Sequence, residues 1–322
     1  MQSIYWQHLT DRNQLKGLIG FNGLIGLNYL NCLNDLNGGS YAIYMDRESL
    51  GGCRQKGDDM TDYQKLSDEE LLSLLFTEAD RLPRAPVDEF VRRGEGMFEA
   101  LAEIASTQYK WTKEPPEWWA AIHSVFILGA IGGDKTILPL AQALRWAVAY
   151  DCDWVTEKLP SIFGKVGAEA AGVLQFISID ATSNWYTRTL AMEGLAAISI
   201  NHPEVEKDVF SCIGAIFKNE NEELDVRQHA GNILLDFLRE EYKDALLAFG
   251  KEEDIAWNED HFYGAVFTES DVHESFSKRE KDLWSYTRDW LSFYDEHEIQ
   301  KRQERWKKRI GRRGKEKMRR QG

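Results

Sequence analysis

"WYTRTLAMEGLAAISINHPEVEKDVFSCIGAIF", residues 185–217, contains two runs of apolar residues at helical spacing, joined by a turn. In the first run, Ala191, Leu195 and Ile198 are four and three residues apart, so their side chains share one face of a helix. A pair of short helices like this can bury its apolar faces only against neighbouring pairs. The stretch therefore predicts an all-α protein built from repeated helix pairs.

The same pattern occurs at residues 119–144, 154–177 and 225–249. Four apolar anchor positions align the copies, namely Leu128, Phe163, Leu195 and Leu234. These anchors are 35, 32 and 39 residues apart, which suits two short helices and a turn. We therefore predict a right-handed α-solenoid of four to five helix pairs that share one continuous core.

The repeats resemble the HEAT-like repeats named after phycobilisome lyases. More narrowly, "LPRAPVDEFVRRGEGMFEALAEI" (82–104), "DWVTEKLPSIFGKVG" (153–167) and "YTRTLAMEGLAAI" (186–198) are similar to segments of an uncharacterised bacterial HEAT-like family. The resemblance covers roughly residues 66–250 and implies a HEAT-like α-solenoid. Some members of that family end in a cysteine-rich SEC-C zinc tail. This chain has no cysteine after Cys212, so that zinc site is not expected here.

Two helices are predicted ahead of the repeats. Ser67 and Glu70 have the spacing of a capping box at the start of the first helix, and Pro83 follows its end. The second helix is predicted to span "PVDEFVRRGEGMFEALAEIAS", with Pro86 near its first position. With these helices included, residues 60–250 form the predicted repeat domain.

Residues 251–300 are predicted to form an acidic, aromatic-rich helical cap, which an array of helical repeats needs at its end. Thr268 and Asp271 have capping-box spacing. The second part of the cap is predicted to be a helix that covers the last repeat. Its buried stripe would consist of Leu283, Thr287, Trp290, Leu291 and Tyr294.

Residues 1–59 have a different character. In "GLIGFNGLIGLNYLNCLNDLNGG" (17–39), leucine or another apolar residue recurs every third position, so the apolar side chains wind around an α-helix without forming a face. Repeated asparagines interrupt every window long enough for a membrane span, and no transmembrane segment is expected. Codons for Lys56–Asp59 can also contain a ribosome-binding sequence ahead of Met60. We expect translation to start at Met60. A poorly ordered N-terminal arm is the alternative.

Charge is unevenly distributed along the chain. Residues 301–322 carry a net charge of +10, and the total of −14 therefore leaves −24 for residues 1–300. Nucleic-acid binding depends on basic side chains that displace counterions, so an acidic body disfavours it. Such a body favours a basic protein partner.

The sequence contains no recognisable catalytic constellation or cofactor site. The seven histidines form no zinc-binding motif, and His261 and His273, near Asp271, are the only cluster considered for a metal. Cys152 lies between two aspartates, which disfavour its thiolate, and no Gly-rich phosphate loop is present. The four cysteines include no CxxC pair, which is typical of a reducing compartment, and we expect a cytoplasmic bacterial protein. No catalytic, cofactor or metal residue is therefore predicted.

Tryptophan is the unusual residue, with 11 in the chain. Trp119, Trp154 and Trp185 stand nine or ten residues before their anchors, and Arg188 and Arg227 each stand seven before theirs. The tryptophans are interpreted as packing residues at the starts of first helices. The alternative is an aromatic ladder that, with the two arginines, forms a candidate interaction surface.

The basic tail, residues 301–322, has too few apolar residues to fold alone and is predicted to be disordered or helical. Three interpretations stay open: it lies on the acidic body, it contacts RNA or an anionic surface, or it only aids solubility. The candidate basic residues are Lys301, Arg302, Arg305, Lys307, Lys308, Arg309, Arg312 and Arg313.

These observations favour a non-catalytic adaptor that binds a protein partner, with a basic segment as the expected partner chemistry. A bilin lyase-like protein that binds a tetrapyrrole is an alternative, suggested only by the name of the repeats. Association of the basic tail with nucleic acid or ribosomes is a second alternative.

Overall fold

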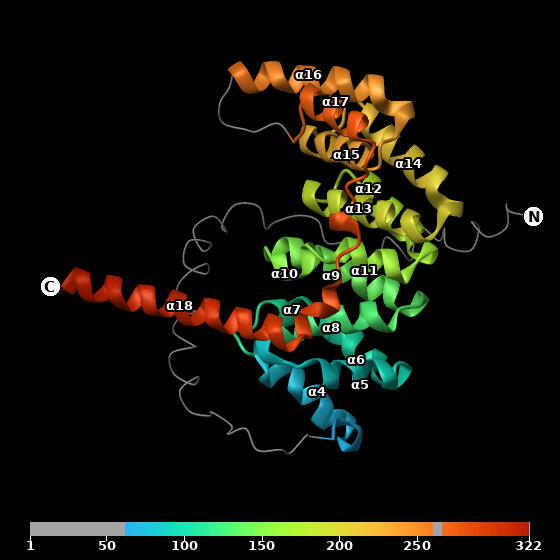
Figure 1. Ribbon diagram of the computed structural model, residues 1–322. Coiled ribbons are helices and arrows are strands. Elements are labelled where there is room, and N and C mark those ends of the chain that lie inside the picture. The colour runs from blue at the N-terminus through green and yellow to red at the C-terminus, as the bar shows by residue number, and fades with distance from the viewer. Residues whose placement is uncertain (1–61, 260–265, 322) are drawn as a thin grey trace, which may run out of the picture. The chain divides into compact units, whose positions relative to one another are not determined.

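The computed structural model describes the backbone of residues 62–259 and 266–321, and every regular element within these ranges is a helix (Figure 1). The chain therefore belongs to the all-α class. The proposed leader at residues 1–59 lies outside the described residues. Contacts divide the chain into two units, of which Tyr63–Ile299 forms one and includes all the predicted repeats.

The unit Tyr63–Ile299 contains paired helices in chain order. The N-terminal elements are η2 (Tyr63–Lys65), α4 (Asp68–Thr77), η3 (Ala79–Arg81), α5 (Arg84–Arg93), α6 (Glu95–Ser106) and α7 (Gln108–Trp111). The first helices of the four pairs are α8 (Trp119–Ile131), α10 with α11 (Asp153–Thr156 and Leu159–Val166), α13 (Trp185–Asn201) and α15 (Leu224–Asp236). The second helices are α9 (Ile137–Ala149), α12 (Ala171–Ile179), α14 (Pro203–Lys218) and α16 (Lys243–Glu259). Short turns η4 (Asp134–Thr136), η5 (Ala168–Ala170) and η6 (Glu240–Tyr242) join the first helix of a pair to the second.

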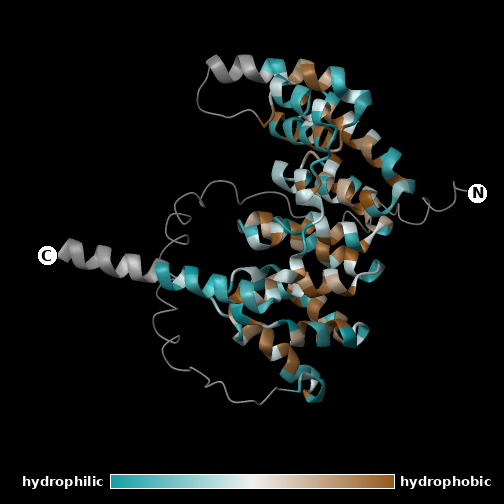
Figure 2. Ribbon diagram, viewed as in Figure 1, coloured by the Kyte–Doolittle hydropathy of each residue, from teal (hydrophilic) through white to brown (hydrophobic). Residues whose placement is uncertain are grey.

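Neighbouring pairs bury the predicted apolar face. All four anchors lie in first helices, and each is at most 2% exposed. Helix α8 packs against α11, α11 against α13, and α13 against α15. Figure 2 shows hydrophobic residues, in brown, on the faces where successive helices meet. The periodicity read from the sequence is therefore the periodicity of the core.

Two predicted helices differ from the structure. The helix expected from Pro86 onward is two helices, α5 and α6, because Gly94 has φ +52° and ends the first. The first helix of the second pair is also divided. Pro160 lies in the first turn of α11, where the missing N–H costs no helical hydrogen bond, and the short helix α10 precedes it.

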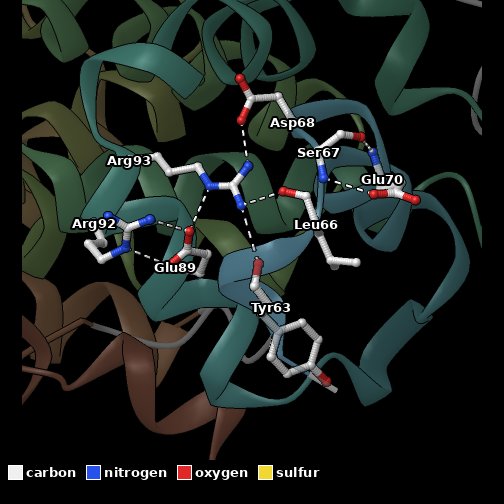
Figure 3. A network of polar contacts seen from close by, with 8 residues as sticks. All are labelled: Tyr63, Leu66, Ser67, Asp68, Glu70, Glu89, Arg92 and Arg93. Carbon is white, nitrogen blue, oxygen red and sulfur yellow. Dashed lines mark hydrogen bonds and ion pairs between the residues drawn. The ribbon is translucent and has the colours of Figure 1, made fainter.

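The N-terminal end of the array is held by one arginine. Figure 3 shows Arg93 of α5 donating to the backbone carbonyls of Tyr63 and Leu66 and to the carboxylates of Asp68 and Glu89. Hydrogen bonds from Arg92 and Arg93 lower the pKa of Glu89 to about 2, although burial of this side chain acts in the opposite direction. The network ties η2 and the start of α4 to α5.

The predicted capping boxes are confirmed at both ends. Ser67 and Glu70 exchange side chain to backbone hydrogen bonds at the start of α4. Thr268 and Asp271 do the same at the start of α17 (Glu269–Lys278), which packs against α16 and α15. A capping helix is therefore present after the fourth pair.

Candidate functional site

The segment after α17 crosses the first helices of the array. Residues 280–295, named the strap here, were predicted to continue as a helix over the last repeat, and that prediction is wrong. The strap contains only two short 3₁₀ helices, η7 (Trp284–Tyr286) and η8 (Trp290–Tyr294). In Figure 1 it runs from α17 past α13 and α11 toward α8, and is drawn in orange to red.

Strap contacts follow the order of the repeats in reverse. The N–H of Asp282 donates to the backbone carbonyl of Asp236 in α15. The N–H of Arg288 donates to Ser161 Oγ in α11 at 2.7 Å. The indole N–H of Trp290 donates to the carbonyl of Phe126 in α8 at 3.1 Å. The strap thus connects the fourth pair to the first.

An aromatic cluster fixes the C-terminal end of the strap. The ring of Phe293 lies between 5.6 and 5.9 Å, centre to centre, from the rings of Trp119, Phe126 and Trp154. Phe293 and Tyr294 are 7% and 1% exposed. We name residues 290–294 with these three rings and His123 the aromatic lock.

The buried His123 has a defined tautomer within this lock. Its Nε2 lies 2.8 Å from the carbonyl oxygen of Ala79, which can only accept, so Nε2 carries the proton. Nδ1 is then the acceptor for the Tyr294 hydroxyl at 3.0 Å. Each polar atom of this imidazole therefore has a partner, and the side chain is fully buried.

The second, third and fourth pairs each place one carboxylate near the strap. Glu157 forms an ion pair with Arg288 of the strap, with Oε2 of the glutamate 2.7 Å from a guanidinium nitrogen. Asp236 Oδ2 accepts from the Tyr286 hydroxyl at 2.7 Å. Glu193, in α13 between them, has neither a hydrogen bond nor an ion pair among the described residues, and Arg288 is the cation that acts on it electrostatically. We name these three residues the acidic row.

Two members of the acidic row titrate far from their ordinary range. Burial, with the nearby negative charge of Asp236, raises the pKa of Glu193 to about 7. Burial also raises the pKa of Asp236 to about 7, and Asp282 adds to this effect while the Tyr286 hydrogen bond opposes it. Both carboxyl groups are therefore partly protonated near neutral pH and would gain from a cation placed beside them.

Two of the three predicted tryptophans pack within the aromatic lock. Trp119 is 1% exposed and lies 5.7 Å from Trp154, which also contacts Phe293, so no open aromatic ladder exists at these positions. Trp185, at the start of α13, is partly exposed and lies 5.4 Å from His229. The packing interpretation holds for Trp119 and Trp154.

The two predicted arginines are correctly aligned but do not form an exposed surface. Arg188 is 1% exposed, donates Nε to the carbonyl of Ser178 at 2.9 Å, and forms a bidentate pair with Glu222. Arg227 donates Nε to the carbonyl of Phe217 at 3.3 Å. Ser178 and Phe217 are each the last residue but one of a second helix, so both arginines cap the helix before their own.

The basic tail continues a helix. Helix α18 spans Glu296–Gln321, so the helical alternative describes its backbone. Lys301, Arg305, Lys307 and Lys308 are exposed and Arg302 is buried. The side chains of Arg309, Arg312 and Arg313 lie outside the described residues.

The described residues offer little for catalysis. Burial raises the pKa of Cys152 to about 12, and it also raises the pKa of Cys212, so neither thiol is activated as a nucleophile. Within residues 62–259 and 266–321, no three His, Cys, Asp or Glu side chains come together as metal ligands. His261 lies outside the described residues, and the exposed His273 of α17 lies 3.8 Å from the carboxylate of Glu269. In the same ranges, no single helix combines the length and apolar composition of a membrane span.

Neither the strap nor the acidic row was predicted from the sequence. A signal for the row was present, because Glu193 and Asp236 are single acids inside apolar helical runs, "AMEGLAAI" and "NILLDFL".

Comparisons of this chain with protein-family models, curated proteins and solved structures found no match.

Proposed function

We propose that this protein is a HEAT-like α-solenoid that acts as a non-catalytic scaffold and binds a basic segment of a partner protein. The observation that carries the proposal is the strap. A segment without α-helix, residues 280–295, lies along four successive first helices and places Arg288 beside the acidic row. A face that holds one segment of polypeptide in this way has the features of a peptide-binding surface.

The repeated arrangement of the pairs supports the solenoid part of the proposal. Equivalent anchors are buried in successive first helices, and equivalent arginines, Arg188 and Arg227, cap the preceding second helix. Each pair packs on its neighbours, as expected for repeats that cannot bury an apolar face alone.

Charge supports a basic partner. Residues 1–300 carry a net charge of −24. The acidic row places three carboxylates near the strap, and among the described residues Arg288 is the strap cation that acts on Glu157 and Glu193. Complementary charge accelerates and selects association, and unpaired carboxylates beside the interface disfavour an acidic partner. Nothing specific in the described residues favours tetrapyrrole or nucleic-acid binding over this function.

Affinity capture of the full chain from cells that express it naturally tests the proposal at pH 8, where Glu193 is ionised. We expect a basic protein to be enriched with the wild type and to be lost with Glu193→Gln. The control Asp208→Asn removes one charge from an exposed position on α14 and should leave capture unchanged. Enrichment that is independent of Glu193, or that nuclease treatment abolishes, would contradict the proposal.

A further inference from the structure

The middle of the strap presents alternate side chains to the helices. Tyr286 and Trp290 are 4% and 7% exposed, and the Arg288 side chain between them is 15% exposed. The intervening Thr287 and Asp289 are exposed. These buried side chains, which come from the end of η7, the link after it and the start of η8, follow the pattern aromatic-x-Arg-x-aromatic.

Each of the three inward side chains has its own place on the helices. The Tyr286 ring packs edge-on against Phe237 of α15, with centres 5.0 Å apart, and its hydroxyl donates to Asp236. Arg288 pairs with Glu157, at the C-terminal end of α10, and Trp290 donates to the carbonyl of Phe126 in α8. Residues from three repeats therefore recognise one short pattern.

Polar groups of the helices also hold the strap backbone. Ser161 Oγ accepts the N–H of Arg288 and faces the carbonyl of Ser285 at 3.5 Å. The carbonyl of Asp236 accepts the N–H of Asp282. Backbone hydrogen bonds combined with alternate side-chain contacts are the means by which extended peptide ligands are recognised.

The strap is an incomplete ligand for this face. Nε of Arg288 is buried without a hydrogen-bond acceptor, and Glu193 has no cation paired with it among the described residues. Trp284, at the edge of the segment, is 68% exposed and stacks on the Arg288 guanidinium at 3.8 Å. A segment with a second cation near the Tyr286 position would satisfy the acidic row better than the strap does.

We propose that the face of α8, α10, α11, α13 and α15 beneath strap residues 282–290 docks a partner segment with the pattern aromatic-x-Arg-x-aromatic, and that the strap is its intramolecular competitor. This inference rests on the proposed function and specifies the chemistry of the partner. Phe293 and Tyr294 of the aromatic lock keep the C-terminal end of the strap attached while residues 282–290 leave the face. The tether keeps the strap at an effective concentration of roughly millimolar, so it excludes weak or incorrect partners.

A peptide added in trans tests this inference. The probe is a fluorescein-labelled peptide of residues 281–291, KDLWSYTRDWL, and fluorescence anisotropy measures its binding to the full chain. The variant Tyr286→Ala/Arg288→Ala weakens the strap and leaves the aromatic lock intact. We expect this variant to bind the probe at least about tenfold more tightly than the wild type, because the intramolecular competitor is weakened.

Two peptide controls define specificity. A probe with Glu in place of Arg288 should bind the variant at least about tenfold more weakly, since it removes the pair with Glu157 and adds repulsion from the acidic row. A probe with Ala in place of Tyr286 should bind the variant more weakly than the original, because it loses the ring contact with Phe237 and the hydroxyl donor to Asp236. Equal binding of the original and a scrambled probe would overturn the inference.

If the double variant does not fold, two other measurements test the inference. Arg288→Ala alone keeps the Tyr286 ring in place and should show the same direction of change. In the wild type, saturating unlabelled peptide should increase hydrogen exchange at the Arg288 amide, because the peptide replaces the strap on Ser161. Unchanged exchange at saturation, or failure of the weakened variants to bind, overturns the inference. Capture that still depends on Glu193 would then leave the scaffold function standing.

Discussion

Replacement of Phe293 by alanine should destabilise the first two helix pairs, which the C-terminal end of the strap contacts. The ring is 7% exposed and contacts Trp119, Phe126 and Trp154 of the first two repeats. Truncation of a buried phenylalanine costs about 3–5 kcal/mol in transfer free energy and cavity formation. Because the lock is formed from rigid rings that cannot collapse into the space, we expect a cost of about 4 kcal/mol.

The location of the effect is as informative as its size. Urea denaturation followed by tryptophan fluorescence measures the free energy of unfolding, and hydrogen exchange locates the loss of protection. We expect exchange to increase in α8 and in the strap, since these elements share the lock. Helices α14 and α16 should keep their protection, because they do not contact it.

A surface truncation gives the matched control. Leu138, at the start of α9, is 46% exposed, and Leu138→Ala should cost about 0.5 kcal/mol or less. Equal costs for the two variants would refute this account of the lock. Exchange that increases in α15 and α17 while α8 stays protected would refute the path of the strap.

Three other predictions concern the acidic row, the helix contacts and the N-terminal network. The folded protein retains protons on Glu193 and Asp236 that the unfolded chain has released, so the free energy of unfolding should fall as pH rises from about 4.5 to about 7. Asp236→Asn should flatten this slope and stabilise the protein above pH 7 in urea titrations, and an unchanged slope would contradict the assignment. A Cβ on Gly129 would lie 2.6 Å from Ile162 Cγ2, so Gly129→Ala should cost about 1–3 kcal/mol, whereas Gly96→Ala, with nothing within 4 Å, should stabilise by about 0.5–1 kcal/mol. Thermal denaturation of both alanine variants checks the opposite signs. Arg93→Ala should increase hydrogen exchange in α4 and leave α15 unchanged, because the network that it breaks is confined to the N-terminal end.

Helical periodicity predicted the part of the fold that local pattern controls. The anchors, the two capping boxes and the packing of Trp119 follow from spacing and residue type alone. Arg188 and Arg227 were found by the same alignment, but sequence could not show that their guanidinium groups point to the end of the preceding helix.

The conformation of the strap could not be predicted, because two effects outweigh the helical spacing of its apolar residues. The side chains of Asp282 and Asp289 accept the N–H groups of Trp284 and Leu291, which starts a new turn at each aspartate. Tertiary contacts then bury aromatic residues at spacings that no single helix provides. The raised pKa of Glu193 depends on the same long-range burial, so the sequence indicated only an isolated acid in an apolar run.

Photo-crosslinking from position 290 tests the central claim most directly. A benzophenone amino acid in place of Trp290 is activated in the full chain, and mass spectrometry of the monomer identifies the linked residues. The account predicts links to α8 or α11, since the Trp290 indole donates to Phe126 and lies 5.7 Å below Lys165 Nζ. Links found only within residues 224–278 would place this segment on the last repeat and contradict the claim that the strap crosses the first helices.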